Sequence, residues 1–146
     1  MLPQRMSLVT LGVADVGRSR SFYEGLGFRA ANFDSEGVAF FDMNGVILGI
    51  FGREDLAEDA NVQIEGGSFS RISVAINLDS ESAVDAAMAF AASKGGQVTQ
   101  PARKVFWGGY AGYFADPDGY LWEIAYNPFW PLDAEGRPEI PPPRSA

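Results

Sequence analysis

The stretch Leu8–Val13 (LVTLGV) decides the fold, because it has a counterpart later in the chain in Arg71–Ile76 (RISVAI). Both stretches have the apolar, branched composition of a β-strand, and each is followed by a segment with helical spacing. A second pair of stretches also matches, since Asn44–Ile50 (NGVILGI) lies over Asp118–Ile124 (DGYLWEI). An internal repeat of this kind predicts two similar modules.

Each module is predicted to contain one helix after its first strand. In the first module, Asp15 is the candidate N-cap, and Gly25 and Gly27 close the helix. In the second module, apolar residues at helical spacing predict a helix over Asp79–Lys94, with Gly95 as its stop.

Three further strands are expected in each module. In the first they are expected near Phe28–Phe33, Val38–Met43 and Val46–Phe51, with the two-residue turn Asn44-Gly45. In the second they are expected over Gln97–Arg103, Tyr110–Ala115 and Tyr120–Tyr126, with a turn at Asp116–Gly119. The order is therefore βαβββ twice, an α+β fold.

The whole chain, residues 1–146, is expected to form one domain. Module one covers about residues 6–52, and an acidic stretch at 53–67 is interpreted as a solvated linker. Module two covers about residues 68–127, followed by a tail at 128–146 that holds six of the nine prolines. This tail is expected to be extended.

The composition excludes several classes of protein. The chain contains no cysteine and no histidine, which excludes disulfide scaffolds, Ser-His-Asp triads and metal sites built on His or Cys. A net charge of -8 disfavours nucleic acid and favours a cationic ligand. No apolar run is long enough to span a membrane, and residues 1–5 lack a signal-peptide core, so a cytoplasmic location is expected.

Strand parity predicts which side chains share a face. One face is bulky, with Val9, Leu11, Val74 and Trp122 among its members, and helices should cover it. The opposite face is small or polar, and it is typical of a cavity wall rather than a packed core; it carries Thr10, Gly12, Arg71, Ser73, Ala75, Leu121, Glu123 and Ala125.

These features resemble the vicinal oxygen chelate superfamily, which includes glyoxalase I, bleomycin-resistance proteins and extradiol dioxygenases. The resemblance rests on Val13–Asp15, Ser21–Glu24 and Leu26–Phe28, and more specifically on Gly108–Gly119 followed by Trp122-Glu123. It covers about residues 6–130. It implies two βαβββ modules, each with a curved, mixed or mostly antiparallel sheet and a helix on the convex face.

The resemblance also implies where a metal would be bound. The family's ligand positions fall on Leu8, on Gly49 (or Leu48), on Arg71 and on Glu123, which is the only carboxylate among them. Leucine and glycine offer no donor and a guanidinium repels cations, so no metal and no cofactor are expected.

The leading hypothesis is therefore a metal-free protein of the bleomycin-resistance type that sequesters a small molecule, cationic or aromatic. Thr10 and Ser73 are expected in the cavity wall, and aromatic rings at its mouth would stack on the ligand: Phe41, Phe51, Trp107, Tyr110 and Tyr113. The alternative is that these rings belong to the core, and the sequence leaves it open for Phe41 and Tyr113.

Two further hypotheses concern the roles of Arg71 and Glu123. In a lyase, an isomerase or a dioxygenase-like enzyme, Glu123 would be the base and Arg71 would stabilise an oxyanion. In a structural reading, the two side chains form a salt bridge that neutralises a buried charge. In either case, parity predicts that they share one face.

A homodimer is expected as well. The resemblance implies it, because members of that family with a single pair of repeats commonly dimerise so that the partner completes each cavity. The tail carries Phe129 and Trp130, two large apolar rings that a lone domain would expose.

Overall fold

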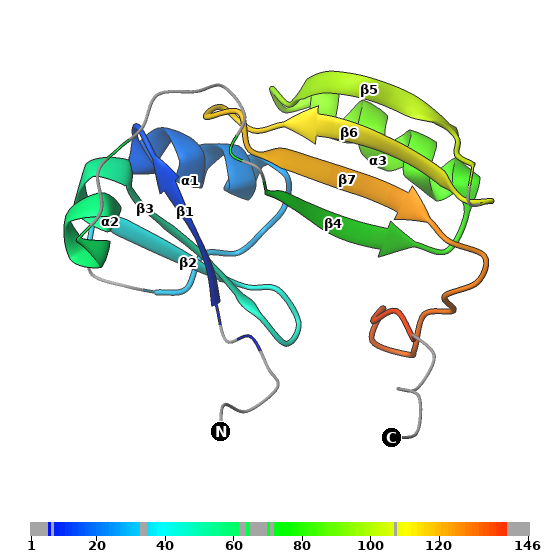
Figure 1. The fold of residues 1–146 in the computed structure, drawn as a ribbon, viewed down its shortest axis with the longest axis horizontal. Helices are drawn as coiled ribbons and strands as arrows, with labels where there is room; N and C mark the ends of the chain where they lie inside the picture. The colour runs from blue at the N-terminus through cyan, green and yellow to red at the C-terminus, as the bar shows by residue number, and fades with distance from the viewer. Residues whose placement is uncertain are drawn as a thin grey trace. The chain divides into compact units, whose positions relative to one another are not determined.

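A computed structural model describes residues 6, 8–32, 35–61, 64, 70, 72–106 and 108–139. The chain divides into two compact units. Unit 1 is Met1–Ser70 together with Pro117–Gly119, and unit 2 is Arg71–Asp116 together with Tyr120–Ala146. Each unit contains one mixed sheet (Figure 1), so the α+β class is confirmed.

Unit 1 contains three strands and two helices: β1 (Leu8–Val13), α1 (Val16–Gly25), β2 (Val38–Asp42), β3 (Ile47–Gly52) and α2 (Arg53–Ala60). Its sheet has the order β1-β3-β2, in which β3 runs parallel to β1 and antiparallel to β2. The central strand β3 therefore has a partner along both edges.

Local chemistry sets the ends of these elements. The Asp15 carboxylate accepts a hydrogen bond from the Arg18 backbone N–H at 2.9 Å, so the predicted N-cap of α1 is confirmed. Asn44 and Gly45 have φ values of 63° and 113°, and the Met43 N–H donates to the Val46 carbonyl across them. This is the predicted two-residue hairpin turn, in which both central residues need a positive φ.

Unit 2 has the complete βαβββ order: β4 (Ser73–Leu78), α3 (Glu81–Ser93), β5 (Gln97–Lys104), β6 (Tyr110–Ala115) and β7 (Leu121–Tyr126). Its sheet has the order β4-β7-β6-β5, with β4 and β7 parallel and the other pairs antiparallel (Figure 1). The Ser80 hydroxyl caps α3 by accepting from the Ala83 N–H, so this helix begins two residues after Asp79.

The predicted bulky faces form the cores. In unit 1, Phe22 and Tyr23 of α1 are buried, and Tyr23 packs on Phe28 and Phe41 with ring centroids 5.9 and 6.0 Å apart. In unit 2, Phe114 stacks on Trp122 with ring centroids 6.4 Å apart. Val84, Met88 and Ala91 of α3 are buried, at the helical spacing read from the sequence. One face of each sheet is thus covered by the helix that follows the first strand.

Three segments differ from expectation. Phe28–Phe33 was expected as a strand, but the part described makes only a single bridge from Ala30 to Phe41, and Phe33 lies outside the described residues. The expected linker is helical over its first half, as α2, and the residue that caps the end of this helix, Asn61, has a φ of 54°. The tail folds back through a bridge between Leu132 and Pro138 instead of staying extended.

The helical start of the expected linker has a physical reason. Glu54 and Asp55 lie in the first turn of α2, where negative side chains interact favourably with the helix dipole.

Across the described ranges, no helix is both long and apolar enough to cross a membrane.

Candidate functional site

A row of three residues crosses the open face of the unit 1 sheet, opposite α1. Gly49 of β3 is the register partner of both Thr10 on β1 and Phe40 on β2. A Cβ at Gly49 would lie 3.1 Å from the Thr10 Oγ1 and 3.4 Å from the Phe40 Cε1. The missing side chain therefore allows the Phe40 ring to lie over the sheet.

Helix α2 covers one end of this open face. A Cβ at Gly12 would lie 3.1 Å from the Cα of Arg53 and 3.2 Å from the Cδ2 of Leu56. The helix approaches the strand this closely because position 12 has no side chain. The rest of the open face stays uncovered by α2.

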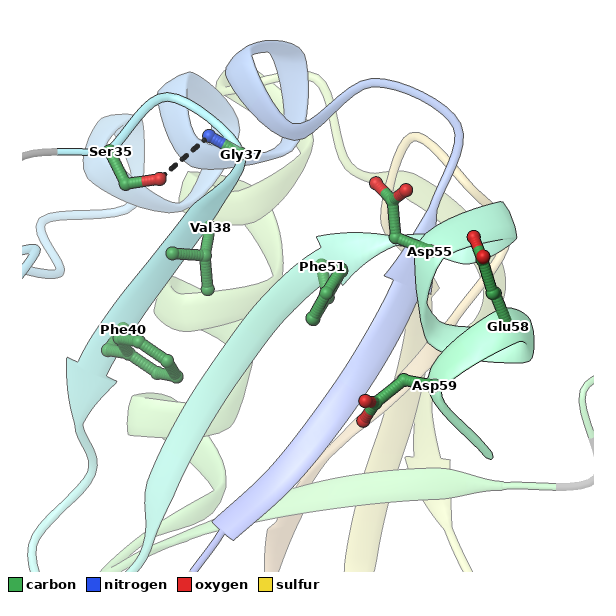
Figure 2. A pocket seen from close by; sticks show the side chains of 8 residues that line it. All are labelled: Ser35, Gly37, Val38, Phe40, Phe51, Asp55, Glu58 and Asp59. Atoms are coloured by element: carbon green, nitrogen blue, oxygen red, sulfur yellow. Dashed lines mark hydrogen bonds between the residues drawn. The ribbon is translucent and has the colours of Figure 1, made fainter. Parts of the chain in front are cut away.

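A groove of about 900 Å³ runs between β2 and α2 (Figure 2). Phe40 and Phe51 form its apolar floor, and Val38 lies beside them. The helix contributes three carboxylates, from Asp55, Glu58 and Asp59 (Figure 2). Ser35 and Gly37 close the other end, where the Ser35 hydroxyl accepts from the Gly37 N–H at 3.2 Å.

The charges of the three carboxylates are not neutralised by ion pairs among the described residues. None of the ion pairs formed by the described residues includes Asp55, Glu58 or Asp59. An oxygen of Asp55 lies 2.7 Å from where a Cβ on Gly52 would be, so this carboxylate folds back over the start of its own helix. Three negative charges beside two rings are complementary to an organic cation with a flat apolar part.

Unit 2 also has an open face, on the side of its sheet away from α3. Tyr113 of β6 and Glu123 of β7 are register partners on this face, and both are partly exposed. Burial is the largest cause that raises the pKa of the Tyr113 hydroxyl, and the charge of Glu123 and a hydrogen bond to it raise it further. Ser73 lies on the same face, because its register partner Leu121 is two residues from Glu123.

The predicted ligand-binding residues belong partly to unit 1 and partly to unit 2. Phe51 lines the groove of unit 1, and Thr10 lies on the same sheet face. Phe41 is only 1% exposed and packs in the core, which is the alternative that the sequence left open. Tyr110 lies on the α3 side of its sheet, where its hydroxyl donates to Asp85 at 2.7 Å and this bond raises its pKa.

Two predicted residues, Arg71 and Trp107, lie outside the described residues. The salt bridge between Arg71 and Glu123 therefore stays a prediction. The register places Ala75 directly beside Glu123 on β4.

Sequence reasoning identified only Phe51 among the residues that line the groove, although the sequence carries a signal for four of the others. Phe40 follows from strand alternation, because it faces the groove while its neighbour Phe41 faces the core. Asp55, Glu58 and Asp59 have the i, i+3, i+4 spacing of one helix face, which was the available signal.

A family model matches residues 5–124, that of the Glyoxalase/Bleomycin resistance protein/Dioxygenase superfamily. The chain belongs to this superfamily. Among functionally curated proteins, none matches the sequence significantly.

Solved structures of the superfamily are similar in fold. A glyoxalase-related enzyme from Fulvimarina pelagi is 36% identical with a TM-score of 0.84, covering 94% of this chain and 99% of its own. A glyoxalase/bleomycin resistance protein/dioxygenase from Nocardioides is 26% identical with a TM-score of 0.74, covering 86% and 85%. A lactoylglutathione lyase from Agrobacterium tumefaciens shares the fold at 19% identity and a TM-score of 0.69, covering 90% and 100%.

The residues at the superfamily's metal-ligand positions do not fit a divalent metal. Leu8 is 47% exposed and apolar, and Gly49 lies between Thr10 and Phe40 without a side chain. Glu123 interacts with Tyr113 instead. Within the described part of the chain, no group of three or more His, Cys, Asp or Glu side chains is placed to hold a metal ion.

Proposed function

We propose that this superfamily member binds a small, flat organic cation in the groove of unit 1 and sequesters it without a divalent metal. The observation that carries the proposal is the groove itself, about 900 Å³ in volume, with rings on its floor and carboxylates on its wall. The net charge of -8 would also attract a cation from solution.

Each part of the groove has a role in this binding. The rings of Phe40 and Phe51 would contact a flat ligand through stacking and cation–π interactions. The carboxylates of Glu58 and Asp59 would select positive charge, and their contribution would fall with added salt.

A fluorescence titration with ethidium, a flat organic cation, tests this function. Saturable binding is expected, with about fivefold weaker affinity when Glu58→Gln and Asp59→Asn are combined, because each exposed charge contributes modestly. The matched control combines Glu81→Gln and Asp85→Asn on α3, which changes the net charge equally in unit 2. Equal losses in both double variants would show that only net charge attracts the dye, and would contradict the groove.

The second candidate is a lyase, isomerase or dioxygenase-type enzyme. Two observations favour it: the 36% identity with a glyoxalase-related enzyme, and the Tyr113–Glu123 pair, which could move a proton. Metal analysis of the purified protein separates the candidates. Stoichiometric nickel, zinc, iron or manganese would favour the enzyme, and its absence together with ethidium binding would favour the sequestering protein.

A further inference from the structure

The open face of unit 2 places its side chains in rows across four strands. One row runs from Gln100 on β5 through Tyr113 on β6 and Glu123 on β7 to Ala75 on β4. The covered face confirms this alternation, because Tyr110 and Lys104 bond to Asp85 and Glu81 of α3.

The rows on either side of Glu123 contain small side chains next to two larger ones, Leu121 and Arg103. Its neighbours there include three alanines, Ala111, Ala115 and Ala125, which end at the Cβ atom. These alanines are buried, and the longer Glu123 and Tyr113 side chains extend further from the sheet. Both remain partly exposed.

Within the described part of the chain, to which Arg71 does not belong, Glu123 keeps unused acceptor capacity. Its register partner Tyr113 can donate one hydrogen bond to a carboxylate that offers about four lone-pair sites. No ion pair within the described part of the chain includes Glu123. Arg103 shares the open face, but it lies in the next row and two strands away.

We propose that the Tyr113–Glu123 pair is a second binding site, which takes the protonated primary amine of a small molecule. An ammonium group has three donors and no acceptor, and it would donate to the free lone pairs of Glu123 and to the phenolic oxygen of Tyr113. The carboxylate at a metal-ligand position of the superfamily thus binds an organic cation in place of a metal ion. This site belongs to unit 2, whereas the groove belongs to unit 1.

An NMR titration tests the site on the full chain labelled with ¹³C in its tyrosine rings. The chain has five tyrosines, and a Tyr113→Phe variant assigns the Tyr113 signals. The probes are n-butylammonium and, as its uncharged counterpart of similar size, n-butanol. Only n-butylammonium is expected to shift the Tyr113 signals in a saturable manner.

Two variants sharpen the result. Glu123→Gln keeps the size and an acceptor for Tyr113, and it should weaken n-butylammonium binding about tenfold, because a charge-assisted bond is lost. Glu81→Gln on α3 removes the same charge from the covered side and should leave the affinity unchanged. The inference is overturned if the Tyr113 signals do not move, if n-butanol moves them equally, or if Glu123→Gln binds as well as the wild type.

Discussion

Asp118 and Ser19 are 99 residues apart in the sequence, and the Ser19 hydroxyl donates to the Asp118 Oδ2 at 3.0 Å. The other oxygen of the same carboxylate accepts from the Ala14 backbone N–H at 2.8 Å and from the Arg18 guanidinium at 3.2 Å. The turn Pro117–Gly119 is therefore part of unit 1, and its carboxylate satisfies the fully buried Ser19.

Replacing Asp118 should destabilise the protein strongly. Asp118→Ala leaves the buried Ser19 hydroxyl without its acceptor, which costs about 1–3 kcal/mol of unfolding free energy. Urea denaturation measures the loss, and the double variant with Ser19→Ala should lose less than the sum of the two single variants. Strictly additive losses would show that the two side chains do not interact.

Adding a methyl group at Gly12 should weaken ligand binding. The new Cβ of Gly12→Ala would lie 3.1 Å from the Arg53 Cα, so α2 must shift and the groove wall must shift with it. We expect a stability loss of about 1–3 kcal/mol and weaker ethidium binding. Gly25→Ala is the matched control, because nothing lies within 4 Å of its Cβ. Unchanged ethidium affinity in the folded Gly12→Ala variant would argue against α2 as the groove wall.

Tyr113 should ionise late in an alkaline titration. Its pKa is raised by burial and by Glu123, so the folded protein holds this proton more tightly than the unfolded chain. Protonated Tyr113 therefore contributes to the free energy of unfolding. This contribution is fully present below about pH 10 and is lost as the pH rises through the pKa of Tyr113 in the folded protein. Absorbance near 295 nm measures the ionisation, and Glu123→Gln should move it to lower pH. A Tyr113 that titrates as a free tyrosine would refute its contact with Glu123.

The tail is expected to support a homodimer. Phe129 is 69% exposed and Trp130 is 41% exposed, and pairing with a second copy would remove these rings from water. Sedimentation at tens of micromolar should show a dimer, and Phe129→Ser combined with Trp130→Ser should shift it toward monomer. A wild-type monomer under these conditions would contradict this expectation.

The sequence predicted the helix cap and the hairpin turn of unit 1 correctly, because neighbouring residues alone determine both. The Asp15 cap and the Asn44-Gly45 turn follow from side-chain oxygens and backbone angles of the residues themselves. The segment after Phe28 fails as a strand because a strand needs a continuous partner, which strand propensity alone does not specify.

The site was less predictable for a related reason. Helix α2 is strongly charged, so its residues 53–60 resembled a solvated linker, and its carboxylates were not considered as ligand contacts. Phe41 was predicted in the cavity but is buried in the core. Strand alternation shows which residues share a face of the sheet, but it does not show which of the two faces a helix covers. That information depends on where α1 packs.

The most direct test of the central claim, binding without a metal, is a calorimetric titration of ethidium into protein dialysed against a chelator. We predict saturable binding at one ethidium per chain, with the same affinity after nickel or zinc is added back. Binding that appears only after the metal is restored, together with stoichiometric metal uptake, would contradict the account.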